Sequence, residues 1–467
     1  MSIQTDTIAA ISTPPGAGAI GILRLSGPLA ITIAEQCFKP LGSKGLREHE
    51  PRRLVYGDLL DSGGQAIDRV LCTYSLGPSS YTGEDTAEFQ CHGSPTVLTL
   101  GLEALFAAGA RQAGAGEFTR RAFLNGRLDL AQAEAVGDLL EAQSREGARH
   151  AAGQLAGALS KKIGDIYSAL VDVMAHFHAV LDYPDEDIDP FRMEELSRTL
   201  EEQTDRLWKL YSSGHRGSLL TQGLKCPIVG RPNAGKSSLL NALAGYDRAI
   251  VTDIPGTTRD TVEVSVQIKG VLVRLIDTAG IRESDDPIER IGVARSREAL
   301  EGSNLIVMVC DGAAPFTQED AGLLEACLNR ADTVLVWNKS DLPSAPVPVL
   351  SLPEELGEHL HTASVSSKTG AGLEELEETM RTLMEEFFPR VREEAYGQLL
   401  TNERQIQAAE AAHHSVYRAL KALQAGVTPD ALLTDVEEAL SALGELTGQS
   451  VREDVTDRIF QRFCVGK

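Results

Sequence analysis

Long apolar segments and paired cysteines are both missing from this sequence of 467 residues. No apolar run approaches 18 residues, and the amino terminus lacks a basic stretch followed by an apolar one. A membrane-spanning helix needs about 20 apolar residues, so we expect a protein that neither spans a membrane nor is secreted. The seven cysteines include no C-x-x-C pair and are odd in number. They favour a reducing compartment, the cytoplasm, over a disulfide framework or a zinc site.

Positively charged residues are also few: the chain has 44 Lys and Arg residues against 67 Asp and Glu residues, which gives a net charge of −23. This balance argues against a broad surface that coats nucleic acid, although a local basic patch or a partner could still present one. Hydrophobic residues make up 42% of the chain, which is ordinary for a globular protein. Since single cores rarely grow past about 250–300 residues, we expect two or three domains.

Three compositions follow one another along the chain. Residues 1–118 are rich in glycine, proline and β-forming residues, with alternating segments such as 20–25, and they predict a mixed α+β domain. From Leu128 the spacing becomes helical, with Val136, Leu139 and Leu140 on one face. An apolar stripe with helical spacing then follows, and we expect it to pack on other helices. Its members are Leu155, Leu159, Ile163, Ile166, Leu170, Val173 and Phe177.

The partners of that stripe are expected near the carboxyl end, more than 200 residues away. One helix is predicted around residues 406–423 and another around 433–443. Thr428 is the expected N-cap of the second helix, and Pro429 is its expected first residue.

The simplest organisation places an α/β domain of residues 222–384 inside a helical domain. The helical domain would comprise residues 119–221 plus 385–467, and the α+β domain of residues 1–118 would precede both. Two separate helical domains are the alternative, but each would leave an apolar face without a partner.

Residues 230–237 read Gly-Arg-Pro-Asn-Ala-Gly-Lys-Ser, which fits the pattern G-x-x-x-x-G-K-[ST]. The apolar run 224–229 predicts a buried strand before it, and residues 238–243 predict a helix after it. In that context the backbone amides form a phosphate cradle, Lys236 reaches the outer phosphates, and the Ser237 hydroxyl can ligate magnesium. The expected contacts in this loop are Asn233, Ala234, Gly235, Lys236, Ser237 and Ser238.

A second motif for the phosphates follows. Alternating segments at 262–268 and 271–275 predict a β-hairpin that ends at Asp277-Thr278-Ala279-Gly280. Asp277 at the end of that strand can hold the magnesium shell, and Gly280 can donate its amide to the terminal phosphate.

A third motif points to the base. Buried strands are predicted at 305–310 and 333–337, and the second leads into Asn338-Lys339-Ser340-Asp341. The Asp341 carboxylate can accept two hydrogen bonds from guanine, a donor pair that adenine lacks. Sites of this kind reject the wrong ligand by about 10⁴-fold. Ser366-Ser367-Lys368 fits the loop that finishes the guanine contacts in such domains.

Two positions depart from the Ras pattern. Ile281 stands where Ras-like proteins place a water-orienting glutamine, so that task must fall elsewhere. Acidic candidates downstream are Glu283, Asp285, Asp286 and Glu289. Asn233 could turn its side-chain carbonyl toward a cation beside the phosphates, or it could simply form a turn. The spacing supports both interpretations equally.

Taken together, these residues closely resemble the bacterial tRNA uridine-modification GTPase family, MnmE or TrmE. The resemblance covers essentially the whole chain. Its most specific markers are residues 230–238, Thr252-Asp253-Ile254 with 256–260, the terminal Cys464-Val465-Gly466-Lys467, Thr82-Gly83-Glu84-Asp85, Cys91-His92-Gly93 and residues 121–125. The resemblance implies a folate-binding and dimerisation domain, a helical domain from two chain segments, and a Ras-like GTPase domain inserted into it.

The resemblance also implies roles at the nucleotide. Ser237 and Thr258 match the magnesium ligands, and Glu289 matches the catalytic residue that orients the attacking water. Pro255 departs from some members, which carry a small residue there. The potassium site matches Asn233, Thr252, Ile254 and Thr257. The further nucleotide contacts implied are Thr252, Asp253, Ile254, Pro255, Gly256, Thr257, Thr258, Asp277, Thr278, Ala279, Gly280, Asn338, Lys339, Asp341, Ser366, Ser367 and Lys368.

In the first domain, the resemblance implies that Arg24, Glu88, Arg127 and Lys467 hold 5-formyl-tetrahydrofolate or a related folate. Other members carry lysine where this chain has Arg127, and both side chains supply a positive charge. No feature of the residues themselves demands a pterin. Without the resemblance, Arg24 and Glu88 would be interpreted as ordinary surface ion-pair residues.

Cys464 invites two interpretations. Beside the basic residues Arg462 and Lys467, its thiol could have a lowered pKa and react. Alternatively, the tail docks on the first domain and the cysteine only packs. His92 and Cys91 are not expected to form a catalytic pair, because adjacent residues of a strand point to opposite faces.

The function implied is a homodimeric GTP hydrolase in the modification of carbon 5 of the tRNA wobble uridine. Potassium-dependent pairing of the GTPase domains would activate it, and a flavin-containing partner protein would join it in a heterotetramer or larger assembly. Because the chain is acidic, tRNA is expected to rest mainly on that partner. Two rivals are a GTP-dependent regulatory or ribosome-assembly switch and a folate-dependent one-carbon transferase regulated by GTP.

Overall fold

The structure is a computed structural model. It describes residues 6–182, 190–248, 262–277, 300–345, 353–385, 387, 396–427, 429–449, 459–460, 463 and 465–466. The chain divides into two compact units. The first comprises Met1–Gly137, Leu155–Gln203 and His414–Lys467, and the second comprises Asp138–Gln154 and Thr204–His413. No helix among the described residues is long and apolar enough to cross a membrane.

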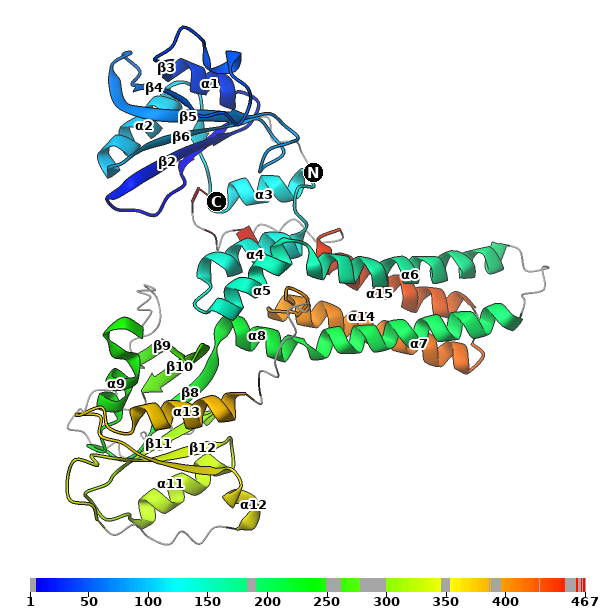
Figure 1. Ribbon diagram of the computed structural model, residues 1–467. Helices are drawn as coiled ribbons and strands as arrows, with labels where there is room; N and C mark the ends of the chain where they lie inside the picture. Colours follow the sequence, from blue (N-terminus) through cyan, green and yellow to red (C-terminus); the bar gives the residue numbers. More distant parts are fainter. Residues whose placement is uncertain are drawn as a thin grey trace, which may run out of the picture. The chain divides into compact units, whose positions relative to one another are not determined.

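The first unit contains a seven-stranded sheet in the order β3-β4-β5-β6-β2-β1-β7 (Figure 1). The strands are β1 (Ile8–Ile11), β2 (Gly18–Ser26), β3 (Phe38–Pro40), β4 (Val55–Leu60), β5 (Ala66–Ser75), β6 (Thr86–Gly93) and β7 (Arg111–Gln112). The alternation predicted for residues 20–25 is confirmed, because Leu23 and Leu25 are buried while Ile20 is exposed.

Helices cover this sheet on both faces. The side chains of α1 (Ala30–Gln36) and α2 (Pro95–Ala107) share one core with Leu23, Leu25 and Phe89. On the other face, Phe118 of α3 (Glu117–Leu124) packs with Ile8 and Ala10. A short 3-10 helix, η1 (Leu46–Glu48), lies between β3 and β4 in the sequence.

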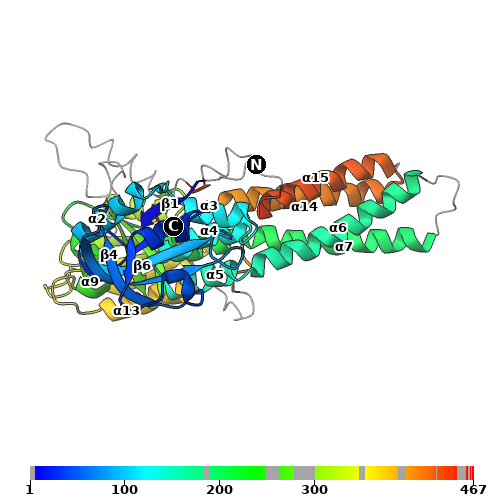
Figure 2. The ribbon, with the colours of Figure 1, turned by 90° about the horizontal axis from the view of Figure 1, so that it is seen from above.

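Long helices from both flanks of the chain pair in the first unit. Helix α6 (Ala158–Asp182) packs along α15 (Pro429–Thr447), as Figures 1 and 2 show. Pro429 begins α15 as predicted, and Thr428 lies outside the described residues. The predicted fold class, with a helical domain built from two distant chain segments, is therefore confirmed. Four further helices are α4 (Leu130–Glu141), α5 (Arg145–Leu155), α7 (Pro190–Ser212) and α14 (Glu403–Gln424). Helix α5 lies in the second unit except for Leu155, and the boundary between the units divides the other three.

One expectation about the helical stripe is wrong. Leu155 belongs to the end of α5 rather than to α6, because the chain turns at Gly157, whose φ of 89° lies in the left-handed region. Val136, Leu139 and Leu140 share one face of α4 as predicted, and along that face Val136 is buried while Leu139 and Leu140 are 37% and 52% exposed.

The second unit contains a six-stranded sheet in the order β13-β12-β11-β8-β10-β9. All neighbouring strands are parallel except β9, which pairs with β10 as the predicted hairpin. The strands are β8 (Leu224–Val229), β9 (Val262–Ile268), β10 (Val271–Asp277), β11 (Ile306–Asp311), β12 (Thr333–Asn338) and β13 (Leu360–Ser364). The strands predicted from the sequence in this region are confirmed.

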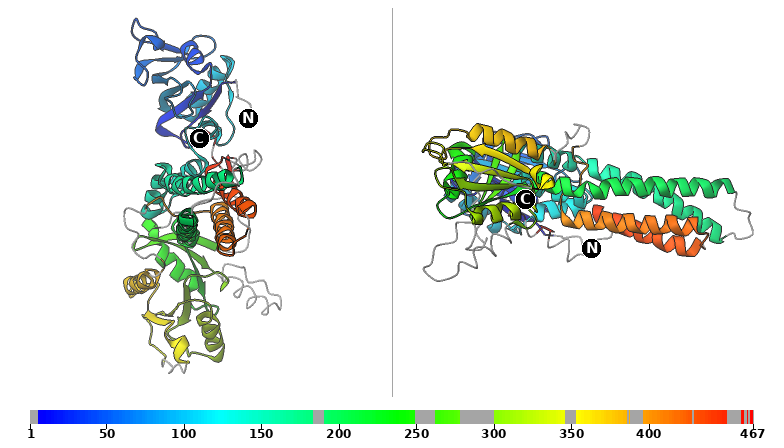
Figure 3. Two further views of the ribbon diagram at one scale, coloured as in Figure 1. Left: turned by 90° about the vertical axis from the view of Figure 1, so that its right-hand side faces the viewer. Right: turned by 90° about the horizontal axis from the view of Figure 1, so that it is seen from below.

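Helices flank this second sheet as well (Figure 3). Helices α9 (Lys236–Arg248) and α13 (Leu373–Met384) contribute to the core on one face, and α11 (Gln318–Leu328) contributes to the core on the other. Helices α8 (Gly214–Gln222) and α12 (Glu354–Gly357) also belong to this unit. From β8 the chain moves to β10 on one side and later to β11 on the other. In parallel sheets, such a reversal opens a crevice at the carboxyl ends of the strands.

Candidate functional site

The loop after β8 needs glycine at two positions. Gly230 has a φ of 146°, and a Cβ added there would lie 2.2 Å from the carbonyl oxygen of Val309. Gly235 has a φ of 96°, and its added Cβ would lie 2.2 Å from Nδ2 of Asn338. Between them, Asn233 is left-handed with a φ of 63°. The pattern G-x-x-x-x-G-K-[ST] therefore corresponds here to a tight loop against β11 and β12.

Lys236 begins α9 and folds back over this loop. Its ammonium donates to the carbonyl oxygens of Gly230, at 2.8 Å, and Arg231, at 2.9 Å. The side chain is buried, and this burial lowers the pKa of Lys236 although the nearby Asp277 carboxylate opposes the shift. A buried cation at a helix amino terminus, beside backbone amides, is a favourable place for anionic oxygens.

Ser237 and Asp277 meet across neighbouring strands. The hydroxyl of Ser237, the second residue of α9, donates to Oδ2 of Asp277 at the end of β10, at 2.6 Å. Asp277 is only 3% exposed. A hydroxyl and a carboxylate are hard oxygen ligands of the kind that magnesium prefers, so these two residues fit the predicted metal.

The predicted base-recognition motifs come together at the end of β12. The Asn338 amide donates to the carbonyl oxygen of Ala234, at 3.0 Å, and Oδ1 of Asn338 accepts from the backbone N–H and hydroxyl of Ser367. The Ser366 hydroxyl donates to Asp341 at 2.7 Å. This hydrogen bond, with the charge of Lys368, holds the pKa of Asp341 below its ordinary value. The carboxylate is thus kept ionised, as an acceptor of two N–H donors requires.

Asp311 is a residue of this edge that the sequence analysis missed. Its Oδ2 accepts a hydrogen bond from the Lys339 ammonium at 2.6 Å. Burial alone would raise the pKa of Asp311, but the hydrogen bonds from Lys339 and the Ala313 amide outweigh it, and the pKa lies below the ordinary value. The available signal was an apolar strand, 306–310, that ends in an aspartate at the same edge as Asp277.

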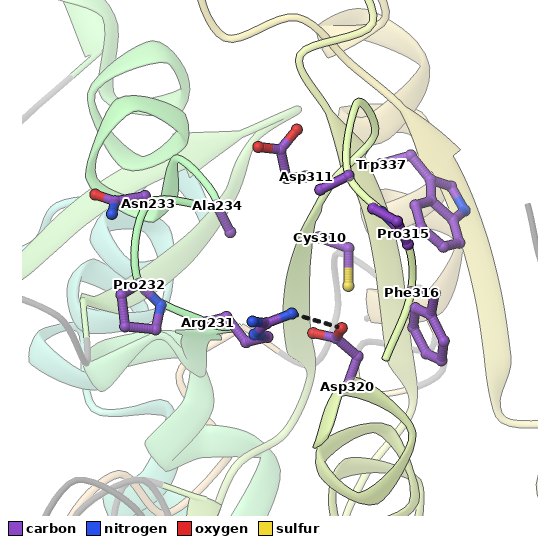
Figure 4. Close-up of a pocket in the computed structure, with 11 residues that line it drawn as sticks. Arg231, Pro232, Asn233, Ala234, Cys310, Asp311, Pro315, Phe316, Asp320 and Trp337 are labelled. Atoms are coloured by element: carbon purple, nitrogen blue, oxygen red, sulfur yellow. Dashed lines mark hydrogen bonds and ion pairs between the residues drawn. The ribbon is translucent and has the colours of Figure 1, made fainter. Parts of the chain in front are cut away.

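Arg231 was also missed. Its guanidinium donates through Nη1 to the Thr317 hydroxyl, at 3.2 Å, and to Asp320, at 3.4 Å. Figure 4 shows Arg231 and Asp320 beside a cavity of about 130 Å³ next to the loop. The cavity is lined by Arg231, Pro232, Asn233, Ala234, Cys310, Asp311, Ala314, Pro315, Phe316, Asp320 and Trp337.

Several predicted nucleotide residues lie outside the described part of the chain. These are Thr252, Asp253, Ile254, Pro255, Gly256, Thr257, Thr258, Thr278, Ala279, Gly280 and Glu289. Cys464 and Lys467 also lie outside it. The structure therefore brings together the loop 233–238, Asp277, the motif 338–341 and Ser366–Ser367, and Lys368 acts electrostatically on Asp341.

In the first unit, Arg24 and Glu88 lie opposite each other on β2 and β6 and form an ion pair at 2.7 Å. The Arg24 guanidinium also lies against the rings of Tyr81 and Phe118, at 5.8 and 5.7 Å from their centroids. Arg127 lies near the segment between β5 and β6 that contains Tyr81. A Cβ added to Gly83 in that segment would be 3.2 Å from Cγ of Arg127. An ion pair with only a structural role would look the same as the Arg24–Glu88 pair. A folate-binding role for Arg24, Glu88 and Arg127 therefore stays a prediction.

The carboxyl-terminal tail contacts the first sheet and α3. Val465 forms an antiparallel bridge with Ala115, and the Ser12 hydroxyl donates to the carbonyl oxygen of Gly466 at 2.9 Å. The Phe463 ring packs on Phe460 with centroids 5.7 Å apart. The neighbours of Cys464 on both sides are thus docked on the first unit.

The described cysteines are buried free thiols. Burial raises the pKa of Cys91 to about 12, which opposes formation of a reactive thiolate. His92 points away from it and is hydrogen-bonded to Asp68 at 2.7 Å. The expectation that His92 and Cys91 form no catalytic pair is consistent with this arrangement.

Comparisons with known proteins cover nearly the whole chain. Residues 7–127 match the family described as GTP-binding protein TrmE N-terminus, and residues 130–464 match the MnmE helical domain. The tRNA modification GTPase MnmE of Chloroflexus aurantiacus is 43% identical over 465 residues, covering 99% of this chain and 100% of that protein. The protein of the same name from Clostridioides difficile is 41% identical over 466 residues, covering 99% of each chain.

Among solved structures, the G domain of the T. maritima FeoB iron transporter is 28% identical. It covers 34% of this chain and 98% of its own, with a TM-score of 0.26, which is too low to add to the assignment. The family matches and the full-length relatives decide the assignment. The chain belongs to the MnmE family of tRNA modification GTPases.

Proposed function

We propose that this chain binds GTP in its second unit and hydrolyses it to GDP and phosphate in the service of tRNA modification. The observation that carries the proposal is the convergence of three distant motifs at one edge of the β8–β13 sheet. Lys236, the Ser237–Asp277 pair and the Asp341–Ser366 pair all lie there. Together they provide a cation for phosphates, oxygen ligands for a metal and an ionised acceptor for guanine.

The phosphates would lie against the loop 230–237, where backbone amides and Lys236 offset their charge. Ser237 and Asp277, with Thr258, would hold Mg²⁺, which neutralises charge on the β- and γ-phosphate oxygens when bound. We also propose that a K⁺ ion binds at this site, held by Asn233, Thr252, Ile254 and Thr257. Glu289 would orient the attacking water.

The base would be read at Asp341. A buried or hydrogen-bonded carboxylate that is left without its two donors costs binding free energy, so adenine is disfavoured. Ser366 donates to one oxygen of this carboxylate and fixes its orientation. Lys339, with its ammonium on Asp311, would lie along the purine.

The wider assembly is proposed from family membership. We infer a homodimer whose GTPase domains pair in a potassium-dependent way, and a flavin-containing partner protein that contributes most of the tRNA contacts. A folate at Arg24, Glu88, Arg127 and Lys467 would supply a one-carbon unit for carbon 5 of the wobble uridine. The same proposal includes three domains, with the boundaries 1–118, 119–221 plus 385–467, and 222–384. It also includes a cytoplasmic location.

GTP turnover in potassium and in sodium tests this proposal. The wild type is expected to hydrolyse GTP faster in potassium, and Asn233→Ala is expected to lose that difference while still binding GDP. Equal rates in both salts, with wild-type behaviour in the variant, would remove the activation model. Unchanged formyl transfer after deletion of 222–384 would favour the one-carbon transferase instead.

A further inference from the structure

The loop between β11 and α11 contacts two cationic residues that belong to two different nucleotide motifs. We use the name β11–α11 loop for residues 311–320, from Asp311, the last residue of β11, to Asp320 in the first turn of α11. Asp311 binds Lys339 of the base motif, and Asp320 binds Arg231 of the phosphate loop. The two carboxylates therefore lie behind the two halves of the proposed nucleotide site.

The first end of the loop is held firmly to the base motif. Asp311 accepts from Lys339 at 2.6 Å through one oxygen and from the Ala313 amide at 2.9 Å through the other. The Gly312 amide donates to the carbonyl oxygen of Asn338 at 2.7 Å. Lys339 has a φ of 63°, which is costly for a residue with a Cβ. The ion pair therefore helps to hold Lys339 in a conformation that it would not adopt by itself.

The second end is a helix cap that also receives Arg231. Asp320, 5% exposed, accepts from the Thr317 amide at 2.9 Å and from its hydroxyl at 2.7 Å. Arg231 then adds a third donor to the same oxygen. The carbonyl oxygen of Arg231 in turn accepts from Lys236. A shift of Arg231 would thus move an oxygen that positions the phosphate-binding lysine.

The middle of the loop keeps its two ends at a fixed separation. The Phe316 ring packs on Trp337 of β12 with centroids 5.7 Å apart. The amide of Ala345, beyond the base motif, donates to the carbonyl oxygen of Gly312 at 2.9 Å. The loop is therefore anchored to the same strand that carries Asn338 and Lys339.

We propose that the β11–α11 loop is a positioning element for the nucleotide. Asp311 positions Lys339 against the purine, and Asp320 acts through Arg231 to position the phosphate loop and Lys236. This inference rests on the proposed GTP site and adds two positioning carboxylates and one positioning arginine to it. The two ends act on different parts of the ligand, so their loss has different kinetic consequences.

Binding of a fluorescent GDP analogue and steady-state GTP turnover test the proposal on the full-length chain. Asp311→Asn is expected to weaken nucleotide binding about three- to tenfold with turnover at saturation nearly unchanged. That range is the effect of a charge-assisted hydrogen bond, reduced for partial exposure. Asp320→Asn and Arg231→Gln are each expected to lower turnover at saturation by about the same factor.

A double variant and two controls separate positioning from general destabilisation. Arg231→Gln combined with Asp320→Asn should lose less than the two single losses added together, because both single changes remove the same ion pair. Arg231→Lys should restore part of the turnover, since it keeps the charge. Glu319→Gln removes the other carboxylate that pairs with Arg231, at 3.4 Å, and should have little effect because that carboxylate is 72% exposed.

The measurements distinguish a wrong positioning role for the β11–α11 loop from a wrong assignment of GTP binding and hydrolysis. A wild type that takes up no guanine nucleotide overturns the proposed function. A wild type that binds and hydrolyses GTP, with all three single variants matching it in binding and turnover, overturns the positioning role alone. Equal losses in binding and turnover for all three variants would also overturn it, because that pattern indicates only a weakened fold.

Discussion

His150 makes the stability of the second unit depend on pH in a predictable direction. This residue of α5 is fully buried, and its Nε2 accepts a hydrogen bond from the Leu399 amide at 3.3 Å. Acceptance at Nε2 requires the neutral ring. Burial lowers the pKa of His150 from the ordinary 6.5 to about 4. The unfolded chain therefore binds a proton between these two values while the folded chain does not.

The magnitude follows from that difference. Each pH unit between 6.5 and 4 removes about 1.4 kcal/mol of unfolding free energy, so the total loss approaches about 3 kcal/mol. Stability contributed by the neutral ring is complete above pH 6.5 and falls as the pH drops toward 4. Other groups titrate in the same range, so the quantity to compare is the wild type against His150→Gln, which keeps a neutral acceptor.

Urea unfolding followed by tryptophan fluorescence measures this difference. Both tryptophans of the chain, Trp208 and Trp337, belong to the second unit and report on it. The wild type should lose about 2.5 kcal/mol more than His150→Gln between pH 7.5 and pH 4.5. A difference between the two proteins that stays constant over this range would refute the reasoning.

Two further predictions concern other parts of the chain. Gly235→Ala should lower nucleotide affinity at least about tenfold, because its Cβ would meet the Asn338 amide and its φ of 96° is strained for alanine. Calorimetric titration with GDP measures this affinity. Gly164→Ala is the control, because a Cβ added at Gly164 has no atom within 4 Å. Glu117 has its pKa lowered to about 2, where burial is outweighed by hydrogen bonds from Arg111, the Gly114 amide and Arg121. The stability that it contributes should be present above pH 4.5 and lost toward pH 2, about 3 kcal/mol in all. Hydrogen exchange in α3 should show this loss in the wild type and not in Glu117→Gln, and identical acid profiles would contradict it.

The parts of the site that could be predicted from sequence are those whose chemistry is local. The loop 230–237 carries its glycines, lysine and serine in one stretch. Asp277 ends a strand with a clear apolar pattern, and Asp341 lies in the motif that begins where another such strand ends. Strands β8, β11 and β12 have the expected positions because nearly all their residues are buried, and β9 has its expected position because its apolar residues alternate. The same logic predicted the pairing of α6 with a distant carboxyl-terminal helix.

The parts that could not be predicted depend on contacts between distant residues. Arg231 meets Asp320 across 89 positions, and Asp311 meets Lys339 across 28. His150 accepts from a backbone amide 249 positions away. The break at Gly157 was hidden because the apolar spacing continues through it. Exposure of Leu139 and Leu140 depends on neighbours that periodicity does not reveal.

The central claim is that the second unit binds a guanine nucleotide, and the preference of the site for one base over another tests this claim most directly. Competition of GTP, ATP and XTP for a fluorescent GDP analogue should be measured on the wild type and on Asp341→Asn. The wild type should prefer GTP over ATP by about 10⁴-fold. The variant should lose guanine affinity and gain xanthine affinity, because an amide can donate to the second carbonyl of xanthine. Equal competition by ATP and GTP, or a variant with unchanged base preference, would contradict the account.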